Sequence, residues 1–191
     1  MNRRGFLVTC LSGAAALSAL SGCATAYNPP AAAFHEILQK PYRLDAGDQL
    51  RITVFEQEEL TNTYQVDKAG YIAFPLVGAV PARGHTIKDV ERTVAQKLAE
   101  GFIRNPDVSV EVNRYRPFFI MGEVSTGGQY TYVPGMTVQN AIAIAGGYTA
   151  RADQQTVDIT RSINGKVLTG RVPITDPIMP SDTIHVRERV F

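Results

Sequence analysis

Cysteine is nearly absent from this chain of 191 residues, which contains only Cys10 and Cys23. Both belong to the N-terminal apolar segment, so the rest of the chain has no thiol for a disulfide, a zinc site or a nucleophile. Tryptophan is missing, and no two of the three histidines (His35, His85 and His185) have the spacing of a metal-binding pair. We therefore expect no catalytic residues, no metal site and no cofactor.

An excess of charge of either sign is also missing. The sequence has 19 Lys and Arg against 18 Asp and Glu, for a net charge of +1. Loss of an N-terminal leader that holds Arg3, Arg4 and no acidic residue would leave 17 basic residues against the same 18 acidic ones. Nucleic-acid binding needs a basic face, so this balance argues against a nucleic-acid partner.

The N-terminus has the pattern of a bacterial lipoprotein signal peptide. Two basic residues, Arg3 and Arg4, precede an apolar stretch of mostly small residues. The stretch ends in Leu-Ser-Gly-Cys at positions 20–23, which resembles a lipobox, in which the cysteine becomes the lipidated first residue of the mature protein. We therefore predict a cleaved signal peptide over residues 1–22 and acylation of Cys23.

Two questions about this leader stay open. It has about 16 apolar or small residues, whereas a spanning helix needs roughly 20, so a retained anchor helix is the less favoured alternative. Residues 2–7 (NRRGFL) also resemble the twin-arginine export pattern. The export route is therefore left open between the general and the twin-arginine pathways.

The rest of the chain is predicted to be a tether followed by short strands and two short helices. Residues 23–40 are rich in alanine and hold a Pro-Pro pair, which is typical of a linker. Thr86 and Asp89 have capping-box spacing for one helix, and Thr137 can cap the other. Apolar-polar alternation and turn residues predict strands near 50–55, 70–75, 107–113, 118–124, 129–133, 157–161, 166–168 and 183–186.

Two segments echo one another in the two halves of the sequence. Residues 47–52 (GDQLRI) and 181–186 (SDTIHV) both read small, Asp, polar, apolar, polar, apolar. We expect Asp48 and Asp182 to accept hydrogen bonds from backbone amides of a turn where a strand begins. Two such turns can also arise by chance, so the echo alone does not establish a duplication.

Arg114, Tyr115 and Arg116 follow the clearest predicted strand and are the candidate binding residues. An arginine beside a tyrosine suits stacking on a sugar ring or contact with an anionic polymer. The alternative is an exposed strand end whose arginine side chains lie along the protein surface.

Residues 42–54 and 66–80 resemble the opening of the polysaccharide export (Wza/BexD-type) lipoprotein family. Residues 120–130 and 141–149 resemble the soluble-ligand-binding β-grasp (SLBB) module found in the same family, although Ser181 stands where the family usually has glycine. The resemblance implies an α+β fold of two small mixed strand and helix domains, the second of them β-grasp-like. The implied division is a signal peptide at 1–22, a lipidated tether at 23–40, a polysaccharide export domain at 41–115 and an SLBB domain at 116–191.

The resemblance implies a periplasm-facing lipoprotein, anchored to the outer membrane by its lipid, in a machine that exports capsule or exopolysaccharide. Expected partners are other copies of the chain in a ring-like conduit, an inner-membrane polysaccharide co-polymerase and the exported polysaccharide, which Arg114, Tyr115 and Arg116 would contact. A periplasmic glycan-binding lipoprotein that forms no channel is the alternative, and a glycan-modifying enzyme is disfavoured.

Longer family members carry further β-grasp modules and a C-terminal helix that crosses the outer membrane. This sequence ends at Phe191, shortly after its last predicted strand. We therefore expect the lipid to anchor the protein, and either a separate outer-membrane pore protein or a ring that distorts the lipid to complete the path.

Overall fold

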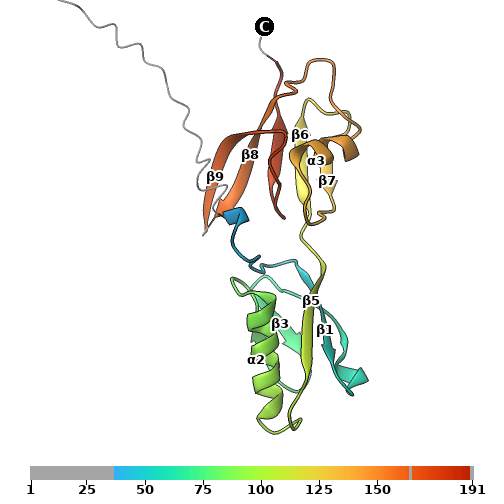
Figure 1. Ribbon diagram of the computed structural model, residues 1–191, viewed down its shortest axis with the longest axis vertical. Helices are drawn as coiled ribbons and strands as arrows, with labels where there is room; N and C mark the ends of the chain where they lie inside the picture. Colours follow the sequence, from blue (N-terminus) through green and yellow to red (C-terminus); the bar gives the residue numbers. More distant parts are fainter. Residues whose placement is uncertain (1–36, 164, 190–191) are drawn as a thin grey trace, which may run out of the picture.

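The computed structural model describes residues 37–163 and 165–189. The chain forms two α+β halves arranged end to end along its long axis (Figure 1). Here the first half means residues 37–114, the second half residues 118–189, and the junction segment residues 115–117 between them. The expected α+β class is confirmed, whereas the leader and Cys23 lie outside the described residues.

The first half is built on a three-stranded antiparallel sheet with the order β2-β1-β5. In the central strand Leu50, Ile52 and Val54 alternate with exposed residues and enter the core, as the sequence pattern predicts. A hairpin of two further strands forms a separate small sheet, and a short 3-10 helix precedes β2. The elements are β1 (Gln49–Val54), η1 (Glu58–Leu60), β2 (Asn62–Gln65), β3 (Tyr71–Phe74), β4 (Gly78–Pro81) and β5 (Val108–Arg114).

Helix α2 (Ile87–Ala99) packs against β5 and begins with the predicted capping box. The Thr86 hydroxyl accepts the N–H of Asp89, and the Asp89 carboxylate accepts the N–H of Thr86. Val90, Val94 and Leu98 are buried one turn apart, which places the predicted apolar face on the core.

The second half holds a five-stranded mixed sheet with the order β7-β6-β10-β8-β9. Its central pair, β6 and β10, is parallel, and the other neighbours are antiparallel. Helix α3 (Val138–Ile144), capped by Thr137 and Asn140, packs against this sheet (Figure 1). A mixed sheet with a helix packed on it is the arrangement expected of a β-grasp module. The strands are β6 (Phe118–Gly122), β7 (Gly128–Tyr130), β8 (Thr156–Ile163), β9 (Lys166–Pro173) and β10 (Thr183–Val186).

Several predicted strand limits were wrong. Strand β9 is longer than the predicted 166–168 because all of Lys166–Pro173 pairs with β8. Strand β7 ends at Tyr130, before the predicted 133, because the ladder with β6 stops where Phe118 begins that strand. Strand β2 was missed because its residues are polar and mostly exposed at the edge of the sheet.

Among the residues that the structure describes, none of the helices is both long and apolar enough to span a bilayer.

Candidate functional site

A cleft of about 540 Å³ lies between the two halves, beside the junction segment. Its walls come from the chain before β1, from the loop between β4 and α2, from the β8–β9 hairpin, and from the loop that leads into β10. The side chains that line it include Arg43, Asp45, Arg83, Arg116, Met179 and Pro180.

Asp48 is fully buried next to this cleft and holds the junction segment to the first half. One carboxylate oxygen accepts the Tyr42 hydroxyl at 2.8 Å and the N–H of Asp45 at 2.9 Å. The other accepts the N–H of Arg116 at 3.1 Å and its Nε at 3.3 Å. The charge therefore has the partners that a buried carboxylate requires, and it fixes Arg116 by both backbone and side chain.

Asp45 joins two arginines at the edge of the same network. Its Oδ1 accepts Nε of Arg83 at 2.8 Å, and its Oδ2 accepts Nη1 of Arg116 at 3.1 Å. Partial burial raises the pKa of Asp45, but the N–H of Ala46 and the two guanidinium groups outweigh it and hold that pKa below the usual value. Asp45 is therefore ionised at neutral pH and compensates part of the charge of both arginines.

Aromatic rings connect the two halves through Tyr115. Its ring meets that of Tyr42 edge to face at a centroid distance of 5.1 Å, and that of Tyr132 at 5.4 Å. Burial raises the pKa of Tyr42, so its hydroxyl stays protonated and donates to Asp48. Each edge-to-face contact contributes roughly 0.5–1.5 kcal/mol beyond the area it buries.

In the second half, Asp182 plays the corresponding role at the start of β10. It is fully buried and accepts Nε and Nη2 of Arg161 at 2.8 and 2.6 Å, together with the N–H of Met179 at 2.7 Å. The next residue back, Ser181, donates its N–H to the carbonyl of Pro117 at 2.9 Å. The predicted turn-capping roles of Asp48 and Asp182 are confirmed.

The three candidate binding residues have different surroundings. Arg114 is exposed at the end of β5. Tyr115 lies between two tyrosine rings, and the side chain of Arg116 is only 18% exposed because it enters the Asp48 network. Their contact with polysaccharide stays a prediction. Tyr42 and Arg83, which share this network, were not selected because nothing local in the sequence links them to Arg116.

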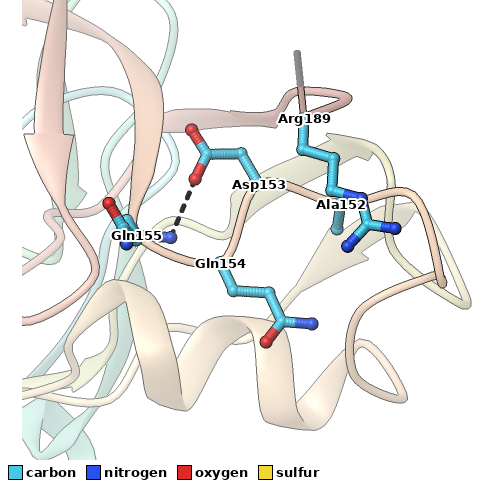
Figure 2. Close-up of a pocket in the computed structure, with 5 residues that line it drawn as sticks. All are labelled: Ala152, Asp153, Gln154, Gln155 and Arg189. Atoms are coloured by element: carbon cyan, nitrogen blue, oxygen red, sulfur yellow. Dashed lines mark hydrogen bonds between the residues drawn. The ribbon is translucent and has the colours of Figure 1, made fainter. Parts of the chain in front are cut away.

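A second hollow, of about 470 Å³, lies in the second half and is lined by Ala152, Asp153, Gln154, Gln155 and Arg189 (Figure 2). The Asp153 carboxylate accepts the N–H of Gln155 at 2.9 Å and pairs with Arg187 at 3.2 Å. The only carboxylate among these lining residues is therefore already used in holding the loop together. Across residues 37–163 and 165–189, no three His, Cys, Asp or Glu side chains gather in a way that could hold a metal ion.

Comparison with protein families identifies both halves of the chain. Residues 37–113 match the family described as polysaccharide biosynthesis/export protein, and residues 117–171 match the SLBB domain. The chain therefore carries a polysaccharide export domain followed by an SLBB domain, in the order that the sequence resemblance implies.

Curated relatives carry names of the same kind. The chain is 36% identical to the exopolysaccharide production protein ExoF of Rhizobium meliloti (strain 1021) over 59% of its own length and 29% of that protein. It is 32% identical to the EPS I polysaccharide export outer membrane protein EpsA of Ralstonia nicotianae over 70% of its own length and 41% of that protein. The chain thus spans well under half the length of these relatives.

Proposed function

We propose that this chain is a lipid-anchored, periplasm-facing component of a machine that exports exopolysaccharide or capsule across the outer membrane. The observation that carries the proposal is the succession of a polysaccharide export domain and an SLBB domain in one chain. Support also comes from the relatives, one of which is named an outer membrane export protein. The anchor in this proposal is Cys23, and the folded domains extend over residues 41–115 and 116–191.

In this proposal several copies form a ring-like conduit, which docks onto an inner-membrane polysaccharide co-polymerase and lets the polymer pass without making or breaking bonds. The role is therefore non-catalytic. A rigid joint between the halves suits such a role, because the walls of a conduit must keep one geometry while the polymer moves. The network of Tyr42, Asp48 and Arg116 supports that rigidity.

Contact with the polymer belongs to the same proposal. Arg114 presents an exposed guanidinium next to the junction segment, whereas Tyr115 and Arg116 are already bound to other side chains. Arg114 is therefore the member of the trio whose side chain is best placed to touch a passing polymer, while the other two hold the backbone there.

A periplasmic glycan-binding lipoprotein that forms no channel is the second candidate. The cleft of about 540 Å³ favours it, because a cavity of that volume suits a short sugar segment bound in place.

Deletion of the gene, with complementation by the intact protein, separates these functions. Loss of a conduit should trap completed polymer inside the cell envelope while synthesis of the repeat unit continues. Electron micrographs of the lipidated protein in detergent should show rings. Normal secretion without the gene would contradict the export role, and a monomeric protein in the micrographs would favour the glycan-binding alternative.

A further inference from the structure

The cleft between the two halves has a basic wall that is not fully neutralised. Arg116 and Arg161 line it, but the buried carboxylates of Asp48 and Asp182 compensate their charges. Two more arginines, Arg43 and Arg83, share the wall with the single carboxylate of Asp45.

Arg43 and Arg83 lie on adjacent stretches of backbone. The N–H of Leu44 bonds the carbonyl of His85, and the N–H of Gly84 bonds the carbonyl of Leu44. The guanidinium of Arg43 donates to the carbonyl of Gly84, next to Arg83 in sequence. Among the described residues, no carboxylate forms an ion pair with Arg43, while Arg83 shares Asp45 with Arg116. The cleft therefore presents positive charge that an anion could meet.

The rest of the cleft is less polar. Apolar surface comes from Pro41, Met179 and Pro180. The cleft is also lined by two residues with hydroxyl groups, Ser162 and Ser181. A sugar ring has the same division, because its C–H faces are apolar and its hydroxyl edges are polar. The volume of about 540 Å³ lies within the range of roughly 300–1,000 Å³ that is typical of small-ligand sites.

We propose that this cleft binds a short segment of acidic polysaccharide, with a sugar carboxylate on Arg43 and Arg83 and the ring against Met179 and Pro180. Arg83 already donates from Nε to Asp45 and from Nη2 to the carbonyl of Lys68, so a sugar carboxylate would meet its Nη1. Among the described residues, Arg43 donates only from Nη1, to Gly84, and offers its other N–H groups. Charge-assisted hydrogen bonds of this kind exceed neutral ones in strength. The inference rests on the proposed export function, which it deepens by naming acidic sugars as the preferred cargo. Because both halves line the cleft, the bound segment would contact the export domain and the SLBB domain at once.

Calorimetric titration of the purified, full-length mature protein with tetragalacturonate tests this proposal. The fully methyl-esterified tetramer, which keeps the sugar rings and lacks the charge, is the ligand control. We expect the acid to bind at least tenfold more tightly than the ester, since loss of charge-assisted hydrogen bonds costs at least that much. Equal affinities for the two tetramers would overturn the proposal.

Protein variants test whether tetragalacturonate binds in this cleft. Arg43→Gln and Arg83→Gln should each weaken tetragalacturonate binding about tenfold or more. Arg51→Gln, which removes an exposed arginine from β1, should leave the affinity unchanged. Thermal melting verifies that each variant is folded, and an Arg43→Gln protein that melts like the wild type and binds equally well would overturn the proposal.

Two further results would also contradict the proposed acidic-sugar site. Inorganic sulfate that displaces the tetramer at matched ionic strength would show a general anion site, and equal weakening by Arg51→Gln would show non-specific charge attraction. The export role is tested separately by gene deletion. Lost secretion with no binding of the acidic tetramer would overturn the cargo preference alone.

Discussion

Asp48 and Asp182 occupy the same position in two copies of one turn. Each carboxylate accepts the N–H of the residue three positions earlier, which is Asp45 in the first turn and Met179 in the second. Each aspartate also donates its own N–H back to the carbonyl of that earlier residue, at 3.2 Å in both turns. Both carboxylates are fully buried, and an arginine neutralises each of them.

The two turns hold the junction segment from opposite sides. In the first turn Asp48 accepts the N–H of Arg116, and beside the second aspartate Ser181 donates to the carbonyl of Pro117. Consecutive residues of the junction are thus fixed to different halves of the molecule. The two similar sequence segments therefore form the same kind of turn, and each turn holds the junction segment to one half of the molecule.

The residue before each aspartate has a left-handed backbone, with φ of +96° at Gly47 and +69° at Ser181. Glycine adopts this conformation freely, whereas a residue with a side chain is disfavoured there by roughly 1–2 kcal/mol. We expect Gly47→Ala to lower the free energy of unfolding by about that amount. Ser181→Gly should leave it unchanged or raise it by up to about 1 kcal/mol. Urea unfolding of the two variants measures both effects, and the same sign for both would contradict this account.

The hydroxyl of Tyr42 is the next testable part of the joint. It donates to Asp48 and accepts from Nη2 of Arg116, so Tyr42→Phe leaves both charged groups short of a partner. We expect a loss of about 1–3 kcal/mol in the free energy of unfolding. Tyr71→Phe is the matched control because Tyr71 is 43% exposed and its hydroxyl makes no hydrogen bond to the described residues. Equal stabilities for the two variants would show that the Tyr42 hydroxyl contributes nothing.

Acid should weaken the same network through Asp45. The pKa of Asp45 is lower in the folded protein, where the Ala46 N–H and two guanidinium groups outweigh the effect of burial. Its contribution is therefore fully present above the unfolded-state pKa of about 3.9 and is lost as the pH falls through the folded-state value. Urea midpoints between pH 6 and pH 3 should fall with pH, and less steeply for Asp45→Asn. Parallel pH profiles for the two proteins would contradict the assignment.

Local features of the sequence predicted local structure well. The capping box at Thr86 and the helix cap at Thr137 depend on residues three positions apart, and the turns at Asp48 and Asp182 also depend on near neighbours. The candidate site was only partly predictable, because its contacts join residues that are far apart in the sequence. Tyr42 and Arg116 are 74 positions apart, and only folding of the first half brings the tyrosine to the junction.

Strand β5 allows a direct test of which face lies in the core. Val110 is 4% exposed, and its N–H bonds the carboxylate of Glu91 at 3.4 Å, so Val110→Asp would place a charge in apolar surroundings beside a like charge. We expect a loss of more than about 4 kcal/mol, enough to prevent folding of the first half. Ser109→Asp, one position earlier on the exposed face, should change stability by less than about 1 kcal/mol. Circular dichroism melts of both variants make the comparison, and a Val110→Asp protein with a normal melt would reverse the assigned faces.

The lipid anchor in the proposed function depends on one group, the thiol of Cys23. If the segment at 20–23 is a lipobox, signal cleavage leaves this cysteine at the N-terminus and acylation holds the protein on the membrane. We expect mass spectrometry of the mature protein to find an acylated Cys23. The Cys23→Ser variant should accumulate as an uncleaved precursor or as a soluble protein, and Cys10→Ser, a change within the predicted leader, should be processed normally. An unmodified Cys23, or a Cys23→Ser protein that fractionates with the outer membrane as the wild type does, would contradict the anchor and would require another way to hold the chain at the export site.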